Sequence, residues 1–143
     1  MHTLIKQYIE SNAFSRLIGM HFQIIKLGEI KYEVLVTNQH LATPNAAHGG
    51  LVAALVDGAL GVAGLSLVCH QNKVVSTIEY KLNYLSPVKL NDLLVANAKV
   101  ISAGKRILVI ECEVISMPET IMVAKAIGTF NAYDAQKAGF SLP

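Results

Sequence analysis

The chain has 143 residues, of which 52% are hydrophobic and only 15% are charged. Soluble domains typically carry charge on about a quarter of their residues, so we expect additional surface to be buried in a homodimer or homotetramer. The net charge of +2, without any run of Lys or Arg longer than two residues, gives no nucleic-acid footprint. A chain of this length is predicted to form one domain, residues 1–143.

The chain contains two cysteines, Cys69 and Cys112, and neither belongs to a Cys/His cluster with metal-ligand spacing. We therefore expect buried free thiols in a reducing, cytoplasmic compartment, and no metal site. His40 and His70 are interpreted as surface or loop histidines. The first residues, Met1 to Lys6, lack the basic-then-apolar pattern of a signal peptide.

The pattern of hydrophobic residues predicts the secondary structure from the N-terminus onward. An amphipathic helix is expected from Thr3 to Phe14, followed by two strands, His21 to Leu27 and Ile30 to Thr37. A polar loop from Asn38 to Ala47 then leads into a long apolar helix, from about Gly49 to Cys69. The remaining strands are expected at Val74 to Leu85, Leu93 to Ser102, Ile107 to Met117 and Ile121 to Tyr133. Their short connections predict an antiparallel meander of these four strands.

The long apolar helix has the length of a membrane span, since residues 51–68 contain a single charge. That charge, Asp57, lies near the middle of the segment, where a carboxylate is costly to insert into a bilayer. The segment also lacks an aromatic belt and a basic flank. We therefore expect a helix buried inside a soluble protein, with no membrane partner.

A helix that is apolar on nearly every face must be covered on most sides. A strongly curved antiparallel sheet wrapped around it provides that cover, so the predicted fold is α+β, a hotdog fold with one long central helix and a short N-terminal helix. Three glycines inside the helix, Gly58, Gly61 and Gly64, each cost roughly 1 kcal/mol relative to alanine. Close approach of the sheet is expected to explain them.

Asp57 is the only ionisable side chain between His48 and His70. An unpaired buried carboxylate is costly, so it must reach a partner or a wet cleft. It is either a structural carboxylate, hydrogen-bonded to neighbouring backbone or to another subunit, or a functional group. The residue types alone leave both interpretations open.

The start of the long helix provides a second feature. Gly49 and Gly50 are expected to leave their backbone N–H groups unobstructed at the positive end of the helix dipole, where an anion or a developing oxyanion could bind. Asp57 lies two turns, or ~10 Å, beyond Gly50 on nearly the same face. That is too far for both groups to reach one carbonyl carbon within a subunit. Opposed helices in a dimer would bring them together, so the spacing favours a composite site at a subunit interface.

These residues carry a family resemblance. His48-Gly49-Gly50, then Asp57, then the run STIEYKLNYLSP from Ser76 to Pro87, resembles the phenylacetate-degradation-type branch of hotdog thioesterases, within the 4-hydroxybenzoyl-CoA thioesterase-like superfamily. The resemblance extends from about Leu17 to Ala132. It implies hydrolysis of an acyl-CoA thioester to the free acid and CoA, with no metal or other cofactor, because CoA is part of the substrate.

The resemblance also implies roles for individual residues. Asp57 would be the general base for water, or the nucleophile, and the Gly49 N–H would polarise the thioester carbonyl. Thr77 would help to place water, and His48 would shape the site near the thioester.

The chain departs from the family pattern before the long helix. Many members have an asparagine six residues before the histidine of the HGG motif and a glycine three before it, where this chain has Ala42 and Asn45. Asn45 is expected to substitute for the missing amide, or else the departure lowers or alters activity.

Substrate contacts are predicted at four further positions. Gly50 is expected to bind substrate, and Lys81, Lys105 and Arg106 are candidates for contacts with the CoA phosphates. The structural alternative for Lys105-Arg106 is a solvated hairpin tip. Tyr80 and Tyr84 share one face of their strand, and we expect them to pack in the core or an interface.

Three functions remain open from the sequence. The favoured one is an acyl-CoA thioesterase acting on medium-chain or aromatic acyl groups, because an apolar pocket is expected. The second is a non-catalytic acyl-CoA binding protein that uses the same cleft. The third is a hotdog dehydratase or hydratase, in which His48 and Asp57 would move a proton at carbon.

Overall fold

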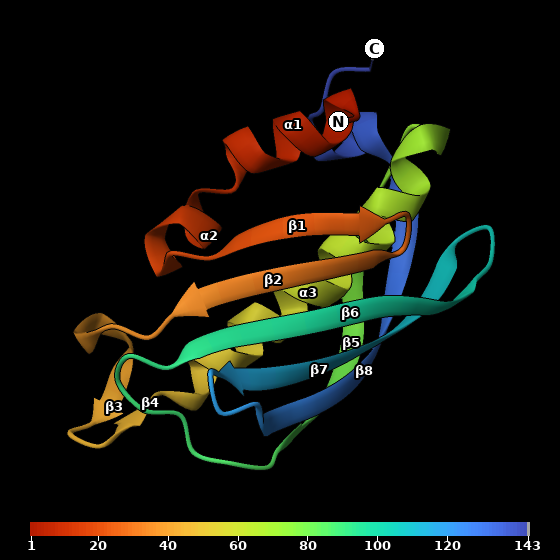
Figure 1. Cartoon of the computed structure of the whole chain (residues 1–143). Coiled ribbons are helices and arrows are strands. Elements are labelled where there is room, and N and C mark those ends of the chain that lie inside the picture. Colours follow the sequence, from red (N-terminus) through yellow and green to blue (C-terminus); the bar gives the residue numbers. More distant parts are fainter. Residues whose placement is uncertain (143) are drawn as a thin grey trace.

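The computed structural model describes residues 1–142, and it shows a curved six-stranded antiparallel sheet packed around one long helix (Figure 1). The helices are α1 (Thr3–Ser11), α2 (Ala13–Ile18) and α3 (Gly49–Val68), with short 3-10 turns at Asn38–His40, Cys69–Gln71 and Ala135–Ala138. The strands are β1 (His21–Lys26), β2 (Glu29–Leu35), β3 (Leu41–Thr43), β4 (Ala46–Ala47), β5 (Lys73–Tyr84), β6 (Leu93–Ala103), β7 (Ile107–Met117) and β8 (Ile121–Asp134). The predicted hotdog arrangement is confirmed, and the expected ends of the long helix and the later strands agree within one or two residues.

The sheet has the strand order β1-β2-β6-β7-β8-β5. The predicted meander is therefore correct for β6, β7 and β8, but wrong for β5, which pairs with β8 rather than with β6. Residues 85–92 are too long for a tight hairpin, and Leu85 still donates its N–H to the Val123 carbonyl before the chain leaves β8. The connection then crosses the end of the sheet, so β5 becomes an edge strand.

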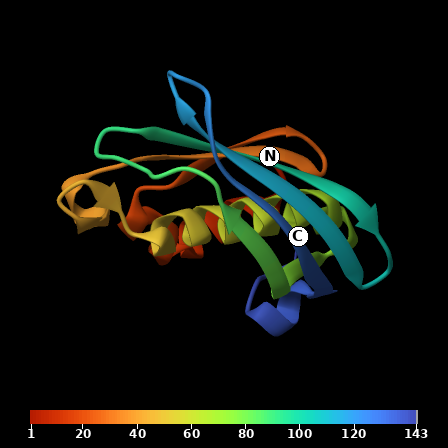
Figure 2. The same cartoon turned by 90° about the horizontal axis from the view of Figure 1, so that it is seen from below.

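Helix α3 lies along the concave side of the sheet (Figure 2). It contacts β1, β2, β5, β6, β7 and β8, and its buried residues include Leu55, Val56, Leu60 and Val62. By length and composition the segment Gly49–Gln71 could cross a membrane, but 67% of its most apolar window is buried within the fold. The sheet thus accounts for the helix being apolar on nearly every face.

The helix glycines allow the sheet to approach closely, as predicted. A Cβ on Gly58 would lie 2.8 Å from Cε1 of Tyr32, which is buried on β2. A Cβ on Gly64 would lie 3.1 Å from Cδ1 of Ile110 on β7. At Gly61 the nearest atom, on Phe130, is 3.5 Å away, an ordinary contact. Close packing therefore explains Gly58 and Gly64 but not Gly61.

The prediction of one continuous N-terminal helix is wrong, because the helix ends before Asn12 and a second helix begins after it. The Asn12 backbone is non-helical, with φ −81° and ψ 72°, and its side-chain oxygen accepts the N–H of Ser15 at 3.0 Å. An asparagine that bonds nearby backbone in this way competes with the helix and starts a new one. The segment therefore turns, and α2 follows α1 as a separate short helix.

The predicted polar loop before α3 is also more ordered than expected. A 3-10 turn, Asn38–His40, is followed by the β3–β4 hairpin, whose turn contains Pro44 and Asn45. The His48 N–H donates to the His40 carbonyl at 2.8 Å, which fixes the hairpin against the start of α3.

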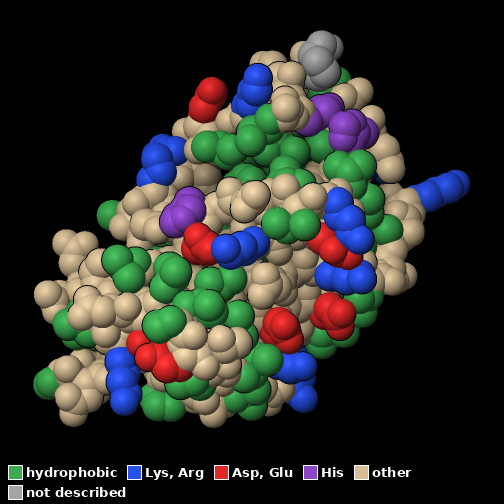
Figure 3. Space-filling view, viewed as in Figure 1, with side chains coloured by type: hydrophobic (Ala, Val, Ile, Leu, Met, Phe, Trp, Pro, Cys, Tyr) green, Lys and Arg blue, Asp and Glu red, His purple; other side chains and the backbone are tan. Residues whose placement is uncertain are grey.

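The outer face of the sheet carries most of the ion pairs. Glu29 lies between Lys26 and Lys99, at 3.2 and 3.1 Å, and Lys125 lies 3.8 Å from Glu113. Lys99 and Lys26 hold the pKa of the Glu29 carboxyl below its usual value. On the face seen in Figure 3, basic and acidic side chains are interspersed, without a single basic patch.

Candidate active site

Asp57 lies in the wall of a pocket of about 450 Å³ between α3, the N-terminal helices and the start of β5. The lining includes Tyr8, Asn12, Phe14, Ala54, Asp57, Gly58, Gly61, Ser76, Thr77 and Phe130. The Thr77 hydroxyl donates to Asp57 Oδ1 at 2.7 Å, so one carboxylate oxygen is held by the strand. The second oxygen has no protein donor among residues 1–142 and can accept from water or substrate.

Three hydroxyl groups on β5 contact one stripe of α3. Besides Thr77, Tyr80 donates to the Ala53 carbonyl at 3.3 Å, and Tyr84 donates to the Gly49 carbonyl at 2.7 Å. The three acceptors are four residues apart, so they lie on one face of the helix. A bulge between Thr77 and Glu79 shifts the strand alternation, which lets odd-numbered Thr77 and the even-numbered tyrosines face the same helix.

The tyrosine contacts refine the expectation from the sequence. Tyr80 and Tyr84 do share a face, as predicted, and Tyr80 is half-buried. Tyr84 is 53% exposed and covers the start of α3 rather than packing in the core. No pattern in the sequence indicates this contact, because it depends on the bulge and on the position of β5 at the edge of the sheet.

The N-terminus of α3 has one open donor rather than the two expected. His48 caps the helix, and its Nδ1 accepts the Gly50 N–H at 2.7 Å. The prediction of an unobstructed Gly50 amide is therefore wrong, because the histidine side chain occupies it. The Gly49 N–H has no acceptor within residues 1–142 and remains available at the positive end of the helix dipole.

The same contact determines which ring nitrogen of neutral His48 carries the hydrogen. A ring nitrogen that accepts a backbone N–H carries no hydrogen, so the neutral His48 ring has its hydrogen on Nε2. In this arrangement His48 offers a hydrogen-bond donor to an incoming ligand and has no free lone pair with which to act as a base.

Within one chain, Gly49 and Asp57 line different pockets. Gly49 lies in a second pocket of about 350 Å³ with Ala47, Tyr84 and Pro87, whereas Asp57 lies in the first. The two residues are eight positions apart on α3, or ~12 Å along its axis. The two separate pockets are consistent with the prediction that Gly49 and Asp57 of a single copy do not both reach one carbonyl carbon.

Phenolic groups border the Asp57 pocket. Burial, followed by the neighbouring Tyr32 and Asp57, raises the pKa of Tyr8 well above its usual value, so Tyr8 stays neutral. Its hydroxyl oxygen accepts from Asn12 Nδ2 at 2.8 Å. Burial likewise raises the pKa of Tyr32, whose hydroxyl is hydrogen-bonded to Ser15. The pocket is therefore mainly apolar, with neutral hydroxyls and a single carboxylate.

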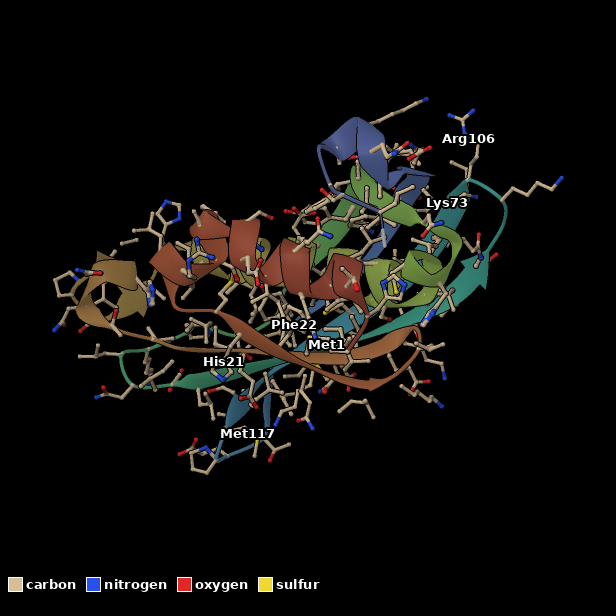
Figure 4. The ribbon with its side chains drawn as sticks, turned by 90° about the horizontal axis from the view of Figure 1, so that it is seen from above. Met1, His21, Phe22, Lys73, Arg106 and Met117 are labelled. Atoms are coloured by element: carbon tan, nitrogen blue, oxygen red, sulfur yellow. The ribbon has the colours of Figure 1, made fainter. Side chains whose placement is uncertain are left out.

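The remaining predicted residues are not all brought together. Asn45 is exposed in the β3–β4 turn, at the Gly49 end of α3, and its N–H donates to Thr43 Oγ1 at 3.3 Å. Lys105 and Arg106 form the β6–β7 turn, where the Lys105 carbonyl accepts from Lys73 Nζ at 2.8 Å. Lys73 and Arg106 occupy one corner of the molecule (Figure 4).

Lys81 lies elsewhere. It is exposed on β5, eight residues beyond Lys73 and so ~26 Å along the strand. The basic group at the corner is thus Lys73, Lys105 and Arg106. Sequence reasoning missed Lys73, because only the pairing of β5 with β8 carries it to the β6–β7 turn.

The fold also brings together three potential metal ligands that are separated in sequence. Ligand atoms of His2, Cys69 and His70 lie within 4.8 Å of one another. However, His2 Nδ1 already accepts the Leu4 N–H, and Cys69 Sγ is placed to donate to the Ser66 carbonyl at 3.5 Å. Burial raises the pKa of the Cys69 thiol. Two of the three ligands are thus already engaged, His2 as a helix cap and Cys69 as a buried thiol, and the absence of a metal cofactor stays a prediction.

A curved antiparallel sheet wrapped around one long apolar helix defines a hotdog fold. The model of the thioesterase superfamily matches residues 45–122, which is more than half of the chain. The chain therefore belongs to the thioesterase superfamily. This membership confirms the resemblance drawn from the sequence and the expected class of enzyme, a thioester hydrolase.

Individual relatives agree with this assignment. Human acyl-coenzyme A thioesterase 13 is 27% identical over 107 residues, which are 73% of this chain and 74% of that protein. The E. coli PaaI protein, from the phenylacetic acid degradation operon, has a TM-score of 0.83 at 23% identity, with 90% of each chain covered. The structure of smu.793 from Streptococcus mutans, bound to acetyl-CoA, has a TM-score of 0.72 at 23% identity over 80% of this chain and 89% of that one. At these identities the two structures support the fold alone.

Proposed function

We propose that this protein is a cytoplasmic acyl-CoA thioesterase, in which Asp57 acts on the thioester as general base or nucleophile. The observation that carries the proposal is the Asp57 carboxylate, fixed at one oxygen by Thr77 in the wall of a largely apolar pocket. The related acyl-coenzyme A thioesterase supports the substrate class. The lining favours medium-chain or aromatic acyl groups, because apolar side chains provide most of it.

The reaction would proceed as follows. The free Asp57 oxygen takes a proton from water, and the water oxygen attacks the thioester carbon. The Gly49 N–H, at the positive end of the α3 dipole, donates to the oxygen that becomes negative. Collapse of the intermediate breaks the C–S bond, and CoA leaves with the proton. If Asp57 is the nucleophile instead, water hydrolyses the resulting anhydride.

The site would be shared between two copies, because Gly49 and Asp57 open into different pockets of one chain. Edge strand β5 exposes Ile78 and Tyr84, and its unpaired side is suited to pairing with a second β5. On α3, the stripe that the sheet leaves half-buried consists mostly of small residues around Asp57. Antiparallel pairing about the middle of β5 would bring Gly49 of one copy beside Asp57 of the other.

The basic corner would meet the other end of the substrate. Lys73 directly precedes Val74, which lines the Asp57 pocket, and the β6–β7 turn adds Lys105 and Arg106. Cations at such a turn suit the CoA phosphates. In this proposal Asn45 stands near the Gly49 end of the same composite site.

Asp57→Asn tests the assigned role. It should lower kcat for acyl-CoA hydrolysis by at least a hundredfold, within the range that general acid–base catalysis supplies, while circular dichroism and oligomeric state stay unchanged. The matched control is Glu113→Gln, which makes the same carboxylate-to-amide change on the outer face of the sheet, where Glu113 lies 3.8 Å from Lys125. A panel of acyl-CoA substrates in a thiol-release assay gives the acyl preference. Binding of acyl-CoA without release of CoA would instead support a carrier or sensor.

A complementation experiment tests the shared site. Gly49→Pro removes the proposed donor, and the change is compatible with the fold. Proline is favoured at the first position of a helix, and the preceding residue, His48, already has the extended ψ of 136° that proline requires. Asp57→Asn and Gly49→Pro should each be inactive alone.

Mixed and refolded together, the two variants should recover about a quarter of wild-type activity, because half of the dimers are mixed and each mixed dimer has one intact site. No recovery, in the presence of demonstrated subunit exchange, would place the whole site within one chain.

A further inference from the structure

The peptide that joins Gly49 to Gly50 is held at both ends by side chains. Its carbonyl oxygen accepts from the Tyr84 hydroxyl at 2.7 Å, and its N–H donates to His48 Nδ1 at 2.7 Å. One of these side chains comes from the start of the helix and the other from the end of β5. The peptide is therefore fixed both by its immediate neighbour in the chain and by Tyr84, which is 35 residues beyond Gly49 in sequence.

The preceding peptide, between His48 and Gly49, is held at its carbonyl, which accepts the Leu51 N–H at 3.0 Å. The C=O and N–H of a trans peptide point in opposite directions. The Gly49 N–H therefore points out of the helix end, away from Leu51. Its direction depends on the two peptides that flank the Gly49 Cα, one fixed by the helix and one by Tyr84 and His48.

The Gly49 residue itself does little to restrict its backbone conformation. Glycine has a wide choice of backbone conformations, and here a second glycine follows it at the end of the helix, where backbone groups lack intrahelical partners. The Tyr84 ring lies against Gly49, with ring and hydroxyl atoms 3.4 to 3.6 Å from the position that a Cβ would occupy. Tyr84 thus restricts the Gly49 backbone in two ways, by packing of its ring and by the hydrogen bond from its hydroxyl.

We propose that Tyr84 is a positioning residue, which orients the Gly49 N–H toward the oxygen that becomes negative during thioester hydrolysis. The inference rests on the proposed function, in which Gly49 is the oxyanion donor. Tyr84 acts through the Gly49 carbonyl and does not itself exchange a proton. Because the oxyanion exists only in the transition state, the contribution of Tyr84 is to kcat rather than to ground-state binding.

Tyr84→Phe keeps the ring and removes only the anchoring hydroxyl. Loss of one hydrogen bond's orienting effect should lower kcat about five- to tenfold, with KM unchanged. An acyl-CoA analogue with a trifluoromethyl ketone in place of the thioester should lose affinity by the same factor, while CoA binds as before. A purely structural role would lower the unfolding temperature without this parallel between kcat and analogue affinity.

Tyr80→Phe is the matched control, since Tyr80 is on the same strand and bonds the Ala53 carbonyl in the same stripe at 3.3 Å. It should leave kcat within about twofold, because a weak neutral hydrogen bond to a mid-helix carbonyl contributes little. An equal fall in both variants would mean general loosening of β5 on α3 and would overturn the proposal. Retention of wild-type kcat and analogue affinity in Tyr84→Phe would also overturn it.

One measurement does not depend on turnover, and it separates this inference from the proposed function. The chain has ten glycines, so glycine-selective ¹⁵N labelling gives a simple NMR spectrum. Tyr84→Phe should shift or broaden the Gly49 and Gly50 signals and accelerate exchange of the Gly50 amide, which is bonded to His48, whereas Tyr80→Phe should not. An unchanged pair of signals would refute the positioning role even if the wild-type protein hydrolyses no acyl-CoA.

Discussion

Alanine at Gly58 and at Gly61 should change stability in opposite directions. Both glycines lie inside α3, where alanine is favoured over glycine by about 1 kcal/mol. At Gly61 the new methyl group would meet Phe130 at 3.5 Å, an ordinary contact, so Gly61→Ala should stabilise the fold by about 0.5–1 kcal/mol. At Gly58 it would lie 2.8 Å from the Tyr32 ring.

The Tyr32 ring has little room to yield. It is 1% exposed, its hydroxyl is bonded to Ser15, and its edge contacts Phe22 with ring centroids 5.4 Å apart. Overpacking a core by one methyl group costs about 1–3 kcal/mol. After the helix gain is subtracted, Gly58→Ala should lose up to about 2 kcal/mol.

Urea unfolding at one fixed protein concentration, followed by circular dichroism, measures both changes. The fixed concentration is necessary because assembly of subunits adds to apparent stability. In thermal unfolding, each kcal/mol corresponds to about 2–4 °C for a chain of this size. Equal shifts of the same sign for the two variants would refute the explanation, because helix propensity alone would then account for both. A stabilised Gly58→Ala would show that Tyr32 can move.

Two further predictions concern side chains in the fold. Thr77→Ala should lower kcat/KM about tenfold in a thiol-release assay, because a charge-assisted hydrogen bond of roughly 1.5 kcal/mol no longer orients Asp57. Thr77→Ser keeps the hydroxyl and should restore most of the activity. Unchanged activity of Thr77→Ala would show that Asp57 does not need this hydrogen bond. Burial raises the pKa of Cys112 to about 12 and also raises that of Cys69, so both thiols should react very slowly with Ellman's reagent at pH 8 in the native protein and both should react in denaturant. Fast labelling of either thiol in the native protein would contradict the buried, protonated state.

The sequence by itself determined the elements and one essential distance. Period-two alternation and a nearly uncharged segment predicted the six sheet strands and α3, because side-chain periodicity is a local property. The fixed rise of a helix placed Gly49 and Asp57 too far apart to share one carbonyl carbon. The family resemblance drew attention to Asp57 and Thr77, and the fold brings the Thr77 hydroxyl to 2.7 Å from the Asp57 carboxylate.

Only the tertiary structure decided which groups meet across the chain. Local periodicity does not specify strand partners, so the pairing of β5 with β8, and with it the approach of Lys73 to Lys105, was not predictable. The bulge after Thr77 shifts the strand by one residue, which is what allows that threonine and Tyr84 to reach the same helix. At the start of α3, the capping bond of His48 consumes one of two apparently equivalent glycine amides. Asp57 is therefore one end of a stripe on α3, and Gly49 is its other end, where Tyr84 of β5 bonds the Gly49 carbonyl. The packing of segments distant in sequence, and not their order in the chain, determines that geometry.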